Sequence, residues 1–322
     1  MEFRTIIPLK EQQPKIDYHS KIFMLGSCFV DNIGDKLDYY KFQNLRNPFG
    51  VFFHPAAIAN FLDRLVSGYK YKDEDVFRHN ERWHCFEAHS NLSNSNKKNL
   101  LRSLNSESRN SAKFLKSATH VVITLGTAWG YQHKDLDKTV ANCHKVPQQE
   151  FEKQLMMVDE IRQSLLQILS SVHLLNPNTC IIFNISPVRH LKDGFVENQW
   201  SKANLLAAVQ QCLAEFSQNE EWAKILSYFP SYEIMMDELR DYRFYAEDML
   251  HPNNTAIDYI WSRFKDVWIA AEAEGTIKDV EKIQKGLSHR SFNPKSKGHQ
   301  KFQKQLQANI NNLKSRYSHI KF

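Results

Sequence analysis

The chain has 322 residues, of which 42% are hydrophobic and 12% aromatic, and its formal net charge is +6. This composition supplies one large core or two small ones and excludes a disordered chain. No apolar run approaches the roughly 18 residues of a membrane-spanning helix, and residues 1–20 lack the apolar segment of a secretory signal. Five cysteines without a Cys-x-x-Cys pair argue against a disulfide framework and a zinc knuckle. We therefore expect a cytoplasmic protein with no membrane partner.

Short apolar segments alternate with amphipathic segments between residues 1 and 277. The expected strands are 22–25, 119–125, 179–185 and part of 225–236, and the expected helices are 28–40, 56–65, 100–115, a long helix from about 148, 200–216 and 254–271. This alternation predicts an α/β fold with a parallel sheet covered by helices on both faces. We interpret the irregular, polar segment 71–115 as an insertion or lid within this domain.

The C-terminal segment 278–322 differs in charge from the rest of the chain. It holds 11 Lys and Arg against 2 Asp and Glu, a balance of +9, so the preceding residues carry −3. Such a segment can contact nucleic acid or an acidic partner, although a solvated or loosely docked tail is the commoner case. We expect a basic tail outside the domain 1–277, and we do not expect nucleic acid as a partner.

A Gly-Ser pair, Gly26-Ser27, ends the first expected strand, and a helical pattern begins directly after it. A strand that turns sharply into a helix presents the turn at the carboxyl end of the sheet, where open α/β folds place their chemistry, and aims helix N–H groups at it. Ser27 is therefore a candidate nucleophile, although the position also suits a helix N-cap. Cys28 is the alternative nucleophile, but a cysteine there is more often a small buried hydrophobe.

The second key feature is Asp248-x-x-His251, in a tight loop before the last expected helix. The spacing lets the carboxylate fold back onto the ring, accept a hydrogen bond from one imidazole nitrogen and leave the other for a hydroxyl. With Ser27, this pair would complete a Ser-His-Asp set. The same two residues could instead cap the following helix.

Several polar residues in the predicted loops are candidates for substrate binding. Arg189 and His190 follow the expected strand 179–185 and could bind a carboxylate or phosphate, or could tie their loop to the acidic segment 238–241. His144 has Cys143 beside it but no further ligands at metal spacing, so we assign it to the substrate pocket and predict no metal site. Asn47 and Asn142 complete the predicted substrate-binding set.

Gly26-Ser27-Cys28-Phe29-Val30 resembles the Gly-Ser-Cys-Phe-Ala signature of the GSCFA domain family, with Val30 in place of the Ala. The match continues through 47–50, 125–129, 142–145, 186–190, 201–203, 228–233 and 248–252, and covers roughly residues 20–270. That family looks like a branch of the SGNH (GDSL-like) esterases and acyltransferases, which implies a three-layer α/β/α flavodoxin-like fold with a central parallel sheet. The similarity implies that Ser27 is the nucleophile, His251 the base and Asp248 its orienter. It also implies a small or carbohydrate-like ester as substrate and no cofactor.

The resemblance departs at the oxyanion site. SGNH enzymes hold the oxyanion with the nucleophile's N–H, a glycine N–H and an Asn side chain. Ser27 and Gly50 fit the first two donors, but Ala128 stands where the Asn would fall. An oxyanion donor contributes about 3 kcal/mol, so a substitute is required, and Thr127, Asn142 and His144 are candidates. The alternative interpretation is a weak or inactive SGNH-like binding module whose basic tail contacts an acidic partner.

Overall fold

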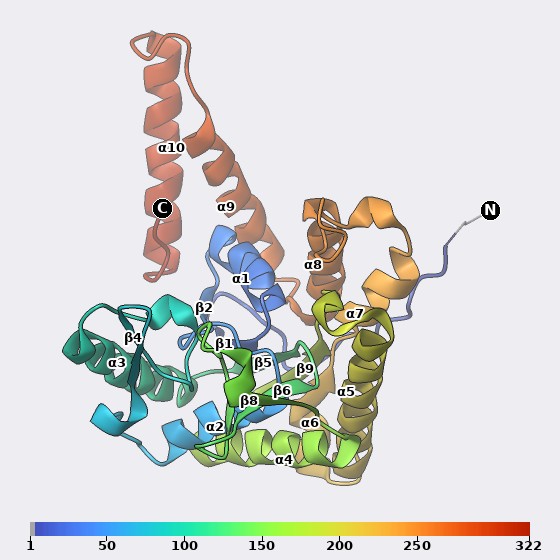
Figure 1. The fold of residues 1–322 in the computed structure, drawn as a ribbon. Helices are drawn as coiled ribbons and strands as arrows, with labels where there is room; N and C mark the ends of the chain where they lie inside the picture. Colours follow the sequence, from blue (N-terminus) through green and yellow to red (C-terminus); the bar gives the residue numbers. More distant parts are fainter. Residues whose placement is uncertain (1–3) are drawn as a thin grey trace.

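The computed structural model describes residues 4–322 and centres on a five-stranded sheet (Figure 1). The sheet order is β10-β9-β5-β1-β2, and each strand is parallel to its neighbours. The strands are β1 (Lys21–Gly26), β2 (Gln43–Arg46), β5 (His120–Leu125), β9 (Cys180–Ile185) and β10 (Leu226–Tyr228). Parallel neighbours require crossover connections, and helices supply them on both faces. The predicted α/β/α fold with a central parallel sheet is confirmed.

Alternate side chains of the central strands enter two separate cores. In β1, Phe23 and Leu25 belong to one buried cluster and Ile22 and Met24 to the other, because successive side chains of a strand point to opposite faces. Helices α2 (Pro55–Val66), α3 (Lys97–Leu115), α4 (Val158–Leu175) and α5 (Phe195–Phe216) cover the first cluster, and α1 (Phe29–Tyr39) and α8 (Asn254–Trp268) cover the second. The loops at the carboxyl ends of β1, β5 and β9 consequently share one edge of the sheet.

A smaller antiparallel sheet follows β5 in the chain. Its strands are β6 (Trp129–His133), β7 (Lys138–Val140) and β8 (Phe151–Leu155), in the order β7-β6-β8. Strand β8 corrects the expectation that a long helix begins near residue 148, since α4 begins only at Val158. The side chains of β8 are buried or half-buried at alternate positions, which is the period of a strand. Two short helices, α6 (Glu220–Ile225) and α7 (Ser231–Glu233), flank β10.

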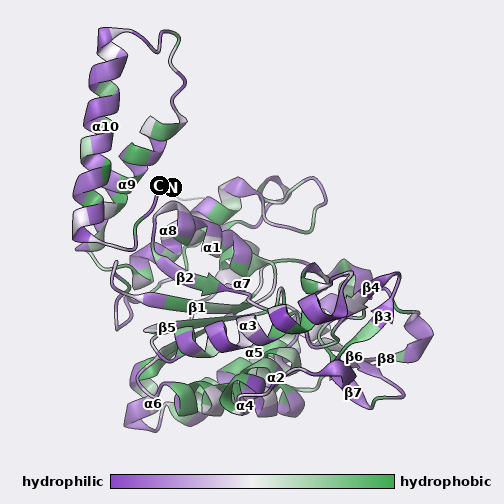
Figure 2. Ribbon diagram, turned by 90° about the vertical axis from the view of Figure 1, so that its left-hand side faces the viewer, coloured by the Kyte–Doolittle hydropathy of each residue, from purple (hydrophilic) through white to green (hydrophobic). Residues whose placement is uncertain are grey.

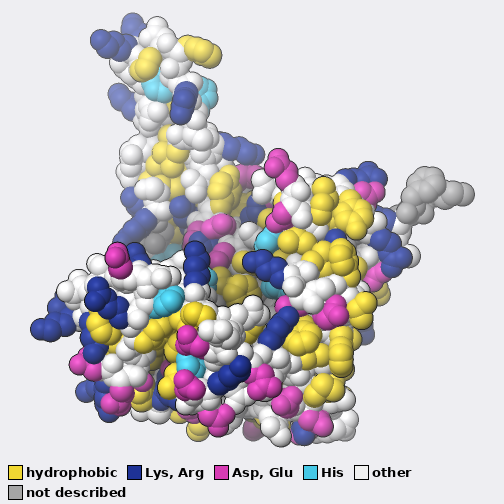
Figure 3. Space-filling model, viewed as in Figure 1, with side chains coloured by type: hydrophobic (Ala, Val, Ile, Leu, Met, Phe, Trp, Pro, Cys, Tyr) yellow, Lys and Arg dark blue, Asp and Glu magenta, His cyan; other side chains and the backbone are white. Residues whose placement is uncertain are grey.

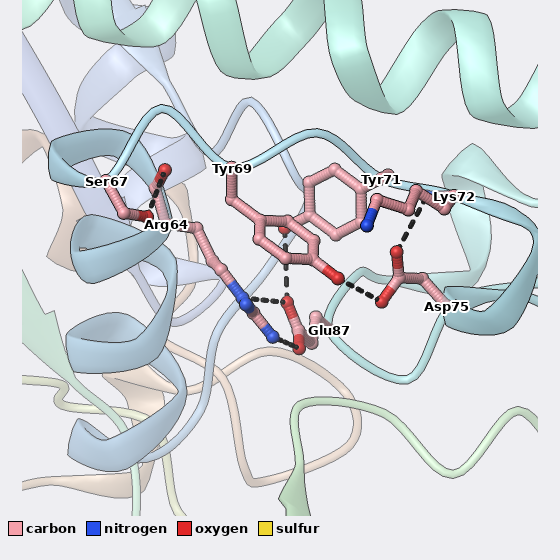
Figure 4. Close-up of polar contacts among 7 residues, drawn as sticks. All are labelled: Arg64, Ser67, Tyr69, Tyr71, Lys72, Asp75 and Glu87. Carbon is pink, nitrogen blue, oxygen red and sulfur yellow. Dashed lines mark hydrogen bonds and ion pairs between the residues drawn. The ribbon is translucent and has the colours of Figure 1, made fainter.

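The segment 71–115 packs against α2 and contains the hairpin of β3 (Phe77–His79) and β4 (Arg82–His84) before α3. Figure 4 shows how polar contacts fix its start. Arg64 of α2 forms a two-pronged ion pair with Glu87, at 3.1 and 2.8 Å, and the Tyr71 hydroxyl donates to the same carboxylate at 3.2 Å. Its buried apolar side chains, Val76 and Leu100 among them, join the first core cluster, so the segment contributes to the core of the domain.

The chain continues beyond α8 with two more helices, α9 (Ala273–Ser288) and α10 (Lys297–Arg316). They lie side by side and project from the body (Figures 1 and 2), and Figure 2 colours α10 mostly hydrophilic. Between them is a small apolar cluster formed by Val280, Ile283, Leu306, Ile310 and Leu313. The solvated tail expected from the charge of 278–322 is therefore a packed helical hairpin, because its few apolar residues recur at helical spacing. None of the helices within residues 4–322 is both long and apolar enough to cross a membrane.

Candidate active site

The loop before α8 brings Asp248 and His251 into direct contact. One carboxylate oxygen of Asp248, Oδ1, accepts the backbone N–H groups of Leu250 at 2.9 Å and His251 at 3.0 Å. The other oxygen, Oδ2, lies 2.6 Å from Nδ1 of the His251 ring. The carboxylate thus folds back onto the imidazole as the three-residue spacing predicted, and Nε2 of His251 is left for another partner.

Electrostatics favour an ionised Asp248. The two backbone N–H groups, of His251 and Leu250, and then the His251 ring lower the pKa of the Asp248 carboxyl to about 2. The carboxylate is therefore charged at neutral pH, and its hydrogen bond fixes the proton of a neutral imidazole on Nδ1. That tautomer presents an unprotonated Nε2, which is the arrangement that a general base requires.

His251 lines a cavity of about 500 Å³ at the carboxyl edge of the central sheet, and we call it the His251 cavity. Its walls come from the β1–α1 turn, the loop before α2, the loops after β5 and β9, the small antiparallel sheet and the loop before α8. The lining residues are Cys28, Phe53, His54, Thr127, Trp129, Tyr131, Val140, Ala141, Asn142, Cys143, Val188, Arg189, His190, Leu191, Lys192, Asp193, Leu250 and His251. None of the described lining residues belongs to 71–115.

The β1–α1 turn has a tightly constrained backbone. Gly26 has a φ of +137°, and a Cβ at this position would overlap the backbone of Thr124 in β5. Its N–H donates to Oδ1 of Asn47 at 3.0 Å. The Ser27 side chain that follows is fully buried, at 0% exposure, and its hydroxyl accepts the Phe29 N–H at 3.4 Å. Ser27, predicted to face a base, is absent from the wall of the His251 cavity, whereas Cys28 is part of it.

Two family models match this chain and together cover most of it. Residues 21–264 match the GSCFA family, and residues 280–322 match the C-terminal domain of GSCFA domain proteins. The chain belongs to the GSCFA family. The first match contains the β1–α1 turn and both Asp248 and His251, so the resemblance inferred from the sequence motifs is confirmed.

Three solved structures are similar to this GSCFA chain. An acetyl esterase mutant with an acetate ion and a carbohydrate esterase family 3 protein from Talaromyces cellulolyticus each share 12% identity, cover 81% of this chain and 99% of their own, and give a TM-score of 0.38. An acetyl xylan esterase from the rumen bacterium Butyrivibrio proteoclasticus shares 11% identity, covers 79% of this chain and 64% of its own, and gives 0.39. No curated protein matches the chain.

The two backbone N–H groups predicted to hold an oxyanion, those of Ser27 and Gly50, are already paired within the GSCFA domain, and so is that of Thr127, a candidate substitute donor. The N–H of Ser27 donates to Thr124 at 3.1 Å, that of Gly50 to Asn47 at 2.7 Å and that of Thr127 to Phe53 at 2.9 Å. The Thr127 hydroxyl contacts the Ser201 hydroxyl at 3.0 Å. Gly50 has a φ of +78° and no room for a Cβ because His89 packs against it. The positive φ of this turn and the contact with His89 thus explain why residue 50 is a glycine.

The predicted substrate-binding residues divide into two groups. Asn142, Arg189 and His190 line the His251 cavity. His144 is buried away from it, with one ring nitrogen 2.8 Å from the Cys85 carbonyl and the other 2.9 Å from the Ser90 hydroxyl. The Asn47 side chain accepts the Gly26 N–H and so stabilises the β1–α1 turn. Both residues therefore have structural contacts in place of the predicted exposure to substrate.

Arg189 and His190 differ in their surroundings. Arg189 forms no ion pair within residues 4–322, and its guanidinium lies 5.6–5.7 Å from three ring centroids, those of Phe195, Tyr242 and Tyr245. Figure 3 shows hydrophobic side chains gathered on this face, over the segment that follows α7. The Nε2 atom of His190 is buried without a hydrogen-bond partner among the described residues. Burial, together with Lys202 and His251, lowers the pKa of His190 to about 3, so its ring is neutral.

Lys202 of α5 is a site residue that the sequence analysis missed. It is 1% exposed, and its ammonium donates 2.7 Å hydrogen bonds to the carbonyls of Gly126 and Ser186, at the ends of β5 and β9. The sequence did carry a signal, because Lys202 lies on the stripe of buried α5 residues that continues through Leu205, Val209 and Cys212. A lysine on such a stripe requires internal acceptors. Within residues 4–322, no group of three metal-ligating side chains is placed to hold an ion.

Proposed function

We propose that this GSCFA protein is an ester hydrolase or O-acyltransferase that uses the Asp248–His251 pair as its general base. The observation that carries the proposal is the 2.6 Å contact between Asp248 Oδ2 and His251 Nδ1 at the wall of the His251 cavity. A carboxylate-oriented histidine next to a strand-to-helix turn with hydroxyl and thiol side chains is the arrangement that nucleophilic acyl transfer needs.

The reaction proceeds in two halves. His251 Nε2 removes the proton of a nucleophile in the β1–α1 turn, which attacks the ester carbonyl and forms a tetrahedral oxyanion. Collapse of this intermediate expels the alcohol, which takes the proton from His251. Water or an acceptor hydroxyl, deprotonated by His251, then attacks the acyl-enzyme and restores the nucleophile. The identity of this second acceptor decides between hydrolysis and transfer.

The oxyanion requires donors other than the predicted N–H groups of Ser27 and Gly50 and the candidate substitute Thr127. The Cys28 N–H at the start of α1 donates to no backbone carbonyl among the described residues, and helix N-terminal N–H groups favour negative charge. His190 Nε2 is the second donor that we propose, because it is buried, unpartnered and on the same wall. A neutral imidazole protonated at Nε2 can donate there, so His190 would replace the Asn whose position Ala128 holds.

A small or carbohydrate-like ester fits the composition of the His251 cavity. Trp129 and Tyr131 provide flat aromatic surfaces of the kind on which sugar rings pack, and the Asn142 side chain provides a polar contact. Arg189 and Leu191 also line an adjoining cavity of about 380 Å³, which includes Tyr232 and Tyr245. A substrate longer than one sugar unit can extend across Arg189 into this second space.

The test is turnover of short acyl esters, including acetylated sugars, by the wild type and the His251→Ala variant. We expect loss of turnover in His251→Ala with folding intact, and unchanged turnover in His289→Ala, which removes an exposed histidine from the end of α9. Equal turnover by His251→Ala and the wild type would refute the proposal.

The second candidate function is a binding module without catalysis. The internal pairing of the predicted oxyanion donors and the basic surface of the α9–α10 hairpin favour it. This function predicts salt-sensitive binding of an acidic partner that is unaffected by His251→Ala. It also predicts that no acetyl ester tested is hydrolysed.

A further inference from the structure

The β1–α1 turn carries two potential nucleophiles, Ser27 and Cys28, that point to different places. Ser27 is fully buried, whereas Cys28 is partly exposed on the wall of the His251 cavity. Successive residues at the start of an α-helix project about 100° apart. A turn that directs one of these side chains inward therefore directs the other elsewhere, and here the thiol shares the cavity with His251.

The turn holds Ser27 in its buried position. The Ser27 N–H extends the ladder of β1 to the Thr124 carbonyl, and the Ser27 hydroxyl accepts the Phe29 N–H. The Ser27 Cβ also packs against Gly126 in the loop after β5. A Cβ placed on Gly126 would lie only 3.1 Å from the Ser27 Cβ. Moving residue 27 as a whole toward the cavity would break the N–H and Cβ contacts, and Gly26 leaves the backbone no room for that shift.

Cys28 is a protonated thiol at rest. Burial and the nearby Asp31 raise the pKa of the Cys28 thiol, against smaller opposing effects of its own N–H, Lys202 and the Phe29 N–H. A protonated thiol is a weak nucleophile until a base removes its proton. The general base on the same cavity wall is His251, oriented by Asp248.

We propose that Cys28 is the nucleophile of the acyl transfer described above and that Ser27 shapes the turn; this inference rests on the proposed function. His251 Nε2 takes the Cys28 proton, and Sγ forms a bond to the carbonyl carbon. The C–O bond to the alcohol then breaks, and the departing oxygen takes the proton from His251, which leaves a thioester. Water or an acceptor hydroxyl gives its proton to His251 and attacks, the C–S bond breaks, and Sγ recovers the proton.

The first test needs no ester and uses Cys143 as an internal control, since both thiols line the same cavity. The full-length protein is treated with iodoacetamide at neutral pH, and alkylation of each cysteine is followed by peptide mapping. We expect Cys28 to react faster than Cys143 and to slow at least about tenfold in His251→Gln, which keeps the bulk of the side chain. An unreactive Cys28, or equal Cys28 rates in both proteins, would overturn the proposal.

The second test compares ester turnover in Cys28→Ala, Cys28→Ser and Ser27→Ala, with circular dichroism as a check on folding. We expect Cys28→Ala to lose at least about 10³-fold in kcat, Cys28→Ser to keep part of the activity, and Ser27→Ala to stay within about tenfold of the wild type. The acyl adduct should map to Cys28 and be released by neutral hydroxylamine, which cleaves thioesters. An adduct on Ser27, or His251-dependent turnover that survives Cys28→Ala, would overturn the assignment and leave the proposed function standing. His251-dependent thiol reactivity without turnover of any ester would instead support the pairing of Cys28 with His251 and refute the ester chemistry.

Discussion

The ammonium group of Lys202 donates a 2.7 Å hydrogen bond to the carbonyl of Gly126, directly beneath the loop that faces the β1–α1 turn. The same ammonium reaches the Ser186 carbonyl at 2.7 Å, and the neighbouring Ser201 hydroxyl accepts the Ala128 N–H at 2.7 Å. Helix α5 therefore anchors the loops after β5 and β9 together. The Lys202 and Ser201 side chains thus hydrogen-bond to the backbone of the loop that contains Ala128, the position at which the Asn was expected.

Replacing Lys202 by Met should change how stability depends on pH. Burial lowers the pKa of the Lys202 ammonium to about 7, from 10.5 when exposed. Between these values the unfolded chain binds the proton more readily than the folded chain, so raising the pH stabilises the wild type relative to Lys202→Met. The difference in unfolding free energy should grow by up to about 1.4 kcal/mol per pH unit in this window and stay constant below it.

Denaturant unfolding of both proteins from about pH 6 to pH 10 measures this difference. Lys224→Met, which removes an exposed lysine of α6, is the matched control and should track the wild type at every pH. A constant difference between Lys202→Met and the wild type across the range would show that the buried ammonium keeps an ordinary pKa.

Asp248→Asn should impair the reaction while preserving the fold. The amide keeps an oxygen for the two backbone N–H groups, but it can no longer hold the His251 ring as a carboxylate does. We expect kcat/KM to fall roughly 10²- to 10⁴-fold. Asp17→Asn is the matched control, because one oxygen of Asp17 also accepts two backbone N–H groups, those of His19 and Ser20, and Asp17 lines neither cavity. Equal losses in the two variants would mean that the effect is structural.

The sequence predicted the layers of the fold well and its loops less well. The buried strands were recognisable because they are runs of five or six residues, rich in β-branched side chains, that are followed by polar turns. The run that forms β5, for example, ends at Gly126. The strand β8 was missed because Phe151 and Leu155 are four residues apart, a spacing that suits a helix. The alternation of buried or half-buried with exposed side chains along β8 depends on its pairing with β6. The α9–α10 hairpin was missed because its apolar stripe is narrow and surrounded by lysines.

The candidate site was predictable where its chemistry is local in sequence. Asp248 and His251 are three residues apart, so their contact follows from the loop alone. Which of Ser27 and Cys28 faces the cavity depends on the rotation of α1 against β5, and the residues 26–28 do not determine it. His190 was named from its place after β9, but its buried and unpartnered Nε2 depends on packing that the sequence does not show. Lys202 reaches the site from α5, and only its place on the buried stripe of that helix signals it in the sequence.

Glu87→Gln tests the contacts that fix the segment after α2 (Figure 4). The Arg64 and Glu87 side chains are each 25% exposed, so the loss of one charge leaves the other partly desolvated. We expect a loss of about 1–3 kcal/mol in unfolding free energy. Glu74→Gln, at an exposed pair with Lys72, should change it by less than about 0.5 kcal/mol. Thermal or denaturant unfolding gives both values, and equal losses would show that the Arg64–Glu87 pair contributes no more than a surface pair.

Gly50→Ala and Gly68→Ala form a matched pair for the loop beside the β1–α1 turn. Both glycines have positive φ, +78° and +63°, so both substitutions carry backbone strain of about 1 kcal/mol. A Cβ on Gly68 meets nothing within 4 Å, whereas a Cβ on Gly50 overlaps the His89 side chain. Gly50→Ala should therefore lose at least about 1 kcal/mol more than Gly68→Ala in denaturant unfolding. Equal losses would mean that His89 moves aside freely, and the loop that carries Asn47 would then be less rigid than its contacts with Gly26 and Asp31 indicate.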